Sequence, residues 1–66
     1  MKIGLKGHGH DHVIDLEAGS TIKQALLKIG IHPSTVIVSH DDTVLPHTTV
    51  LNADVSLDLT IVSSGG

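Results

Sequence analysis

The sequence contains no cysteine, phenylalanine, tyrosine or tryptophan. Without cysteine, the chain forms no disulfide bond and offers no thiolate as a nucleophile or a metal ligand. Small secreted domains usually depend on disulfide bonds, so their absence favours a cytoplasmic protein. Without these aromatic rings, the hydrophobic core has to be built from isoleucine, leucine, valine and alanine.

Arginine is also absent, and the formal net charge is −3 at pH 7. A nucleic-acid-binding domain usually needs a basic surface and aromatic rings for stacking, so we expect no nucleic-acid partner. The sequence has no run of about 20 apolar residues, which a membrane-spanning helix needs, and its first residues lack the apolar stretch of a signal peptide. We therefore expect no membrane association.

The length of 66 residues suits one small domain. No repeat or internal linker divides the chain, so we predict a single domain over residues 1–62 and a flexible tail over residues 63–66. A domain of this size buries only about 60% of the surface that its unfolded chain exposes, so its stability should be modest.

Alternating polar and apolar residues predict strands near both ends of the chain. Residues 1–6 and 13–17 show this period of two, and the glycine-rich residues 7–10 between them predict an antiparallel hairpin. Further strands are predicted at residues 36–38, 44–46 and 57–62, the second of them a short edge strand because it ends in proline. Residues 47–54 are predicted to form a loop with one helical turn.

One helix is predicted over residues 22–29. Ser20 is the expected N-cap, and Gly30 is expected to end the helix in a left-handed backbone conformation. The apolar face of the helix follows the spacing i, i+3, i+4 and i+7 and consists of Ile22, Ala25, Leu26 and Ile29.

The expected element order is therefore β-β-α-β-β-β. A helix with one apolar face covers one face of one mixed sheet, here of four to five strands. In such a sheet the first and last strands can lie side by side in parallel at the centre, which is the β-grasp (ubiquitin-like) arrangement of the α+β class. The predicted core consists of Ile3, Leu5, Ile14, Leu16, Ile22, Leu26, Ile29, Val36, Val38, Leu57, Leu59 and Ile61.

Six segments, in this order, resemble the ubiquitin-like sulfur carriers, above all the ThiS/MoaD group and its small archaeal modifier relatives. They are LEAGSTI at 16–22, GIHP at 30–33, VIV at 36–38, LP at 45–46, LNAD at 51–54 and IVSSGG at 61–66. The chain departs from the family pattern at residues 40–42, where members often carry an Asn-Gly turn, and at residue 53, where they often carry glycine.

The resemblance implies a chemical role for Gly65 and Gly66. An E1-like adenylating enzyme of the ThiF/MoeB type would use ATP to adenylate the Gly66 carboxylate. Sulfur would then form a thiocarboxylate for thiamine, molybdopterin or tRNA thiolation, or a lysine amine would form an isopeptide bond. Glycine suits both routes because no Cβ hinders attack at its carbonyl. The segment Ser-Ser-Gly-Gly is also typical of a flexible or engineered linker.

The resemblance further implies that the protein is a carrier or modifier and not an enzyme. No catalytic constellation appears in the sequence, since the adjacent Asp41 and Asp42 would diverge on a turn. The protein would act as a monomer and bind no cofactor, because the activating enzyme uses the ATP. Its other partners would be a sulfur donor or downstream synthase and the lysines of substrate proteins.

A partner-docking surface is expected on the open side of the sheet. If Val36 and Val38 face the helix, Ile37 faces solvent, and an exposed apolar patch often marks a partner surface. In the ubiquitin-like family, this side meets the activating enzyme. Ordinary surface aliphatic residues are the alternative interpretation. The predicted docking surface comprises Ile37, Val13, Val62, Ser63 and Ser64.

A second function remains open, that of a small histidine-rich metal-binding protein. His8, His10 and His12 alternate along the chain, so on a strand they would share one face. Three imidazoles on one face would suit Zn²⁺, Ni²⁺ or Cu²⁺. The spacing lacks the framework of a structural zinc site, and the competing interpretation is a set of solvated turn histidines.

Overall fold

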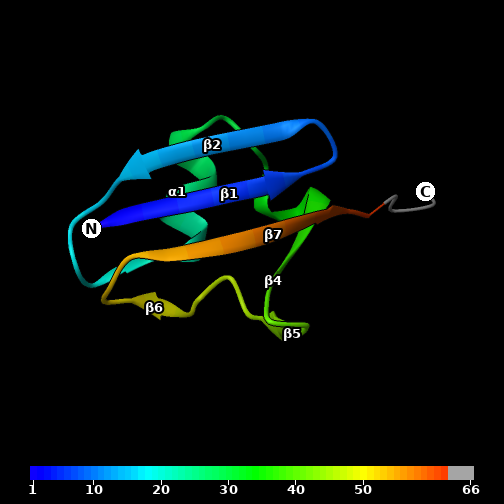
Figure 1. Ribbon diagram of the computed structural model, residues 1–66. Helices are drawn as coiled ribbons and strands as arrows, with labels where there is room; N and C mark the ends of the chain where they lie inside the picture. The colour runs from blue at the N-terminus through cyan, green and yellow to red at the C-terminus, as the bar shows by residue number, and fades with distance from the viewer. Residues whose placement is uncertain (63–66) are drawn as a thin grey trace.

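The computed structural model describes residues 1–62, which form one mixed five-stranded sheet with one helix packed on one of its faces (Figure 1). The strands of this sheet, in spatial order, are β2 (His10–Asp15), β1 (Lys2–Gly7), β7 (Val55–Ile61), β4 (Val36–His40) and β5 (Thr43–Leu45). The helix α1 spans Ile22–Lys28, and a 3-10 helix, η1, spans Pro33–Thr35. The predicted α+β class, with a mixed sheet and a single helix, is confirmed for these residues.

The first and last strands meet in parallel at the centre of the sheet. Leu5 of β1 lies opposite Leu57 of β7, and both side chains are fully buried. The other three pairings, β1 with β2, β7 with β4 and β4 with β5, are antiparallel. The predicted central parallel pair is therefore confirmed.

A second, two-stranded sheet was not expected from the sequence. Ser20–Thr21 (β3) pairs with Val50–Leu51 (β6), and the Gly19 amide donates to the Leu51 carbonyl at 2.8 Å. The prediction of a helical turn within residues 47–54 is wrong, because the segment contains a turn at residues 47–48 and the short strand β6 but no helix. Leu51 consequently enters the core, where it is 6% exposed.

A two-residue turn joins β1 to β2. His8 and Gly9 have φ angles of 47° and 83°, the left-handed values of the type I′ turn that matches strand twist. Pairing therefore resumes at once, with His10 opposite Gly7, and β2 begins three residues earlier than predicted. At Gly7 a Cβ would overlap the carbonyl oxygen of Leu59, so only glycine fits at this end of β1.

Thr21, and not the predicted Ser20, is the N-cap of α1. The Gln24 amide donates to Thr21 Oγ1 at 3.3 Å, and the Thr21 amide donates to Gln24 Oε1 at 2.8 Å. This reciprocal pair is a capping box. Ser20 is instead a strand residue paired with Leu51.

The end of the helix follows the prediction. Gly30 has a φ of 80°, and its amide donates to the Leu27 carbonyl at 3.1 Å. The next amide, of Ile31, donates to the Leu26 carbonyl at 3.0 Å. These two bonds form a Schellman motif, in which glycine provides the left-handed residue.

The core is built from aliphatic side chains of the sheet and the helix. Ile14, Leu16 and Ile29, predicted to be buried, are only partly buried and pack against it. The prediction for Ile61 is wrong, because this residue is 43% exposed. It lies beyond the last paired position of β1, so it has a neighbouring strand on one side only. The buried residues are Ile3, Leu5, Ile22, Ala25, Leu26, Val36, Val38, Leu51, Leu57 and Leu59.

Among residues 1–62, no helix has the length and apolar character needed to cross a membrane.

We predict that Leu26→Ala lowers the free energy of unfolding by about 2–5 kcal/mol, because it leaves a cavity in the core. A domain of this size has a net stability of only a few kcal/mol, so the variant should be largely unfolded at about 37 °C. The matched control is Leu27→Ala, whose side chain is 54% exposed and should change the stability by about 0.5 kcal/mol. Urea denaturation followed by circular dichroism measures both. Equal losses would contradict the assigned buried face of α1.

Thr21→Ala should lower the free energy of unfolding by about 1 kcal/mol, because the Gln24 amide loses its acceptor. Ser20→Ala should have a smaller effect, because the Ser20 side chain does not cap the helix. Thermal denaturation of the two variants compares them directly. A larger loss for Ser20→Ala would show that the cap is wrongly assigned.

Candidate functional site

The described chain ends beside η1 and the beginning of β4. The Val62 amide donates to the Thr35 carbonyl at 3.0 Å, which fixes the path of the backbone just after β7. The end of β7 lies at the same end of the sheet as the turn between β1 and β2 (Figure 1). The predicted site residues Ser63, Ser64, Gly65 and Gly66 lie outside the described residues.

Ile37 and Val13 both face away from the helix, as predicted, with exposed fractions of 38% and 66%. The register places them on the same open face, because Ile37 lies opposite Thr60 and Val13 opposite Gly4. They do not form one patch. Strands β1 and β7 separate β2 from β4, so about 14 Å of sheet lies between the two residues.

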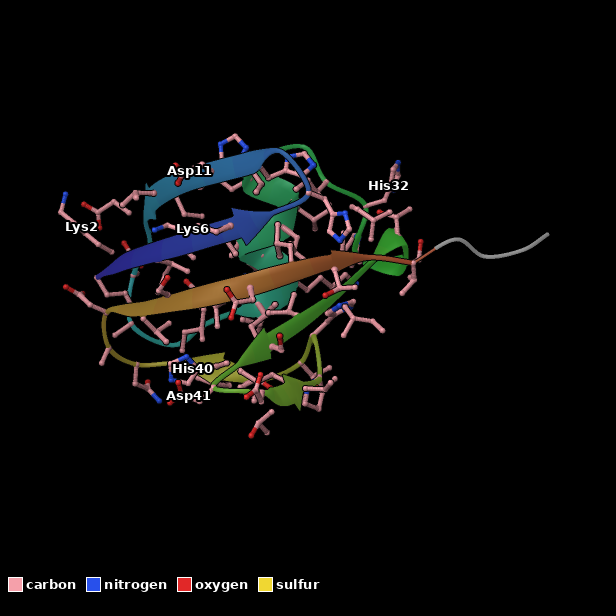
Figure 2. All side chains as sticks on the ribbon, turned by 45° about the vertical axis from the view of Figure 1, so that its right-hand side comes forward. Lys2, Lys6, Asp11, His32, His40 and Asp41 are labelled. Carbon is pink, nitrogen blue, oxygen red and sulfur yellow. The ribbon has the colours of Figure 1, made fainter. Side chains whose placement is uncertain are left out.

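The middle of the open face carries charges of both signs in adjacent rows. Lys6 of β1 lies opposite Asp11 of β2 and opposite Asp58 of β7, and Lys2 lies opposite Asp15. Figure 2 labels Lys2 and Lys6 on β1 and Asp11 on the neighbouring strand. This charged centre divides the exposed apolar residues between the two edges.

At the β5 edge, Ile37 belongs to a shallow, mainly apolar groove of about 210 Å³. Sequence reasoning identified Ile37 but missed Val44, which is 64% exposed, and the turn that follows it. His47 Nε2 lies 3.1 Å from the Val36 carbonyl oxygen and holds that turn against β4. The groove is lined by Val36, Ile37, Val38, Val44, Leu45, Pro46 and His47.

The β4–β5 turn explains how Val44 reaches the groove. Asp41 and Asp42 have φ angles of 50° and 64°, so both adopt the left-handed conformation of a two-residue hairpin turn. This turn sets Val44 opposite Ser39, on the face that also carries Ile37. The signal in the sequence is the pair of aspartates, a residue type that tolerates positive φ, between two β-branched segments.

The three predicted metal ligands are only partly brought together. His10 and His12 lie on one face of β2 with ring centroids 5.8 Å apart, whereas His8 lies in the turn. Within residues 1–62, no group of three His, Asp or Glu side chains is placed so that it could hold a metal ion.

No known protein family matches the sequence, and no curated protein matches it.

We predict that Ile37→Asp lowers the free energy of unfolding by about 1 kcal/mol, because the side chain is partly exposed and the loss is mainly of strand preference. Val38→Asp, one residue along, should unfold the domain, because it buries an unpaired carboxylate where Val38 is fully buried. Thermal denaturation and amide NMR spectra separate the two outcomes. A folded Val38→Asp variant would contradict the assigned faces of β4.

Proposed function

We propose that this protein is a ubiquitin-like carrier or modifier of the β-grasp fold, activated at the Gly66 carboxylate by an E1-like adenylating enzyme. The observation that carries this proposal is the parallel pairing of β1 with β7 at the centre of a mixed sheet with the helix on one face. A β-grasp fold requires its first and last strands to pair in parallel at the centre of the sheet, as β1 and β7 do here. In the sequence, Val62 is followed by small residues, the last two of which are Gly65 and Gly66.

The chemistry needs the terminal carboxylate to become a good electrophile. An oxygen of the Gly66 carboxylate attacks the α-phosphorus of ATP, and pyrophosphate leaves to give an acyl-adenylate. Sulfide then attacks the acyl carbon and displaces AMP, which yields a thiocarboxylate. On the modifier route, a thiol displaces AMP to give a thioester, and a lysine amine displaces the thiol to form an isopeptide bond. Glycine favours each attack because its α-carbon carries no side chain.

The position of Val62 suits delivery of this carboxylate to another protein. The hydrogen bond from Val62 to Thr35 fixes where the chain leaves the sheet. From there, the covalent geometry of residues 63–66 permits a span of at most about 14 Å. Such a span would let an activating enzyme contact the folded domain while its active site acts on Gly66.

The groove around Ile37 is the proposed contact for the activating enzyme. Ile37 lies opposite Thr60, and Val36 lies opposite Ile61, so the groove adjoins the last residues of β7. A single surface of the partner could therefore contact the groove and also receive the chain that follows Val62. Val13 is at the opposite edge of the sheet and is not part of this contact.

The test is ATP–pyrophosphate exchange catalysed by the E1-like enzyme of the same organism. Exchange should be lost with Gly66 deleted and with the Gly66 carboxylate converted to an amide, since both changes remove the reacting group. Neither change should shift the thermal unfolding midpoint, because glycine buries no side chain. Exchange at the wild-type rate with the amide would overturn the proposal.

A second pair of variants tests the docking surface. Ile37→Asp should raise the protein concentration needed for half-maximal exchange by about tenfold or more and leave the maximal rate nearly unchanged. Val13→Asp, which introduces the same charge on the same face at the other edge, should behave like the wild type. Equal effects of the two substitutions would contradict docking at the groove and leave the role of Gly66 intact.

Intact-mass analysis of protein isolated from its own organism distinguishes the two fates. A carrier should show a terminal carboxylate with one oxygen replaced by sulfur. A modifier should be found joined through Gly66 to lysines of other proteins, as branched peptides that keep the C-terminal segment of this chain after protease digestion. A mature chain that does not end at Gly66 would contradict both.

A further inference from the structure

The free edge of β2 carries two imidazoles on one face. His10 lies opposite Gly7 and His12 opposite Leu5, so both side chains project on the side of the sheet that holds the helix. Asp11 and Val13, which alternate with them, project on the other side. β2 stands at one end of the strand order, and β1 is its only partner strand among residues 1–62 (Figure 1). Both histidines are half-buried there and remain accessible to solvent.

The ring nitrogens of these two histidines are available to bind an ion. Elsewhere, His40 Nδ1 lies 3.1 Å from the Ser56 carbonyl oxygen, and His47 Nε2 lies 3.1 Å from the Val36 carbonyl oxygen. Within the described residues, the rings of His10 and His12 take part in no hydrogen bond or ion pair. They lie next to each other with centroids 5.8 Å apart and an interplanar angle of 34°.

We propose that His10 and His12 form a two-imidazole binding site for a divalent transition-metal ion, with Cu²⁺ bound most tightly. With metal–nitrogen bonds of about 2.0–2.1 Å, two imidazoles on one ion hold their centroids roughly 5 Å apart. The observed spacing exceeds this by less than about 1 Å, which small side-chain rotations supply. Pairing of β2 with β1 fixes the backbone of His10 and His12 directly after a tight turn. The backbone therefore needs no movement for both side chains to bind one ion.

The ligand set selects the metal. Imidazole nitrogens suit zinc, copper and nickel, and affinity for a given nitrogen site rises toward Cu²⁺. Zn²⁺ usually takes three or four protein ligands. The described residues offer no third His, Asp or Glu in position, so water has to complete the coordination. Two nitrogens with water oxygens suit the tetragonal geometry of Cu²⁺.

This site uses two of the three histidines that the sequence alone indicates as metal ligands. His8 occupies the first left-handed position of the turn and is not a ligand in this proposal. Asp11 lies on the opposite face of β2. The site is independent of the proposed activation of Gly66.

The test is calorimetric titration of the untagged full chain with Cu²⁺ at neutral pH. We expect one Cu²⁺ per chain, with a dissociation constant on the order of 10 µM and about tenfold weaker binding of Zn²⁺. Acidification to about pH 5 should weaken binding, because protons compete with the metal for the imidazole nitrogens. Electron paramagnetic resonance of the Cu²⁺ complex should show coupling to two nitrogen atoms.

The decisive variant exchanges two neighbouring residues, His12→Val with Val13→His. It keeps the composition and the number of histidines but places the two imidazoles on opposite faces of β2. Cu²⁺ affinity should fall at least about tenfold, and the second nitrogen coupling should disappear. The matched control, His8→Asn, should bind like the wild type, since asparagine tolerates the left-handed turn position.

Circular dichroism without metal shows whether each variant is folded. If the exchanged variant does not fold, His12→Gln replaces it, because glutamine keeps a polar side chain of similar length without an imidazole. Wild-type affinity in a folded His12 variant would overturn the proposal. Loss of binding in His8→Asn, or a ratio of one Cu²⁺ to two chains, would also overturn it.

Discussion

The parallel pairing of β1 with β7 is the interaction on which the rest of the structure depends. It joins residues at the two ends of the described chain, with Ile3 opposite Val55 and Leu5 opposite Leu57. β2 and β4 pair on either side of it, and β5 extends the sheet from β4. Leu26 of the helix belongs to the same buried cluster as Leu5 and Leu57, so the apolar face of α1 is buried against the sheet that this pair centres.

The aliphatic composition shapes how this small core is completed. Because phenylalanine, tyrosine and tryptophan are absent, no single large side chain spans the space between helix and sheet. The structure instead recruits Leu51 from the short strand β6, which pairs with β3 at the start of the helix. The Ile22 amide donates to the Thr49 carbonyl at 3.1 Å, so the second sheet and the first turn of α1 are joined by backbone contacts.

The sequence allowed the main elements, the helix face and the central strand pair to be predicted, because each depends on a period that extends over several residues. The errors occur where the deciding contact is short or distant. The alternation of residues along β7 cannot show that the neighbouring strand β1 stops short of Ile61. Strands of two residues, such as β6, are too short to show any period. The predicted N-cap was Ser20, whereas the signal for its neighbour Thr21 was Gln24, three residues later.

Of the candidate site, the sequence predicted single exposed positions for a similar reason. The exposed position of Ile37 follows from alternation along β4, whereas the groove depends on a turn that brings Val44 beside it. Alternation also implied one face for three histidines, but the turn removes His8 and leaves a pair. The separation of Val13 from Ile37 depends on strand order, and no local pattern encodes it.

The two lateral edges of the sheet also bear on how the folded protein behaves at high concentration. An unpaired edge is a template on which a strand of another molecule can add, and repeated addition leads to fibres. On β2 this edge carries the exposed carboxylates of Asp11 and Asp15, so a second copy would have to approach like charges. On β5 the edge is only three residues long and is followed by Pro46, which has no amide hydrogen to offer. Both edges therefore disfavour growth of the sheet from one molecule into the next.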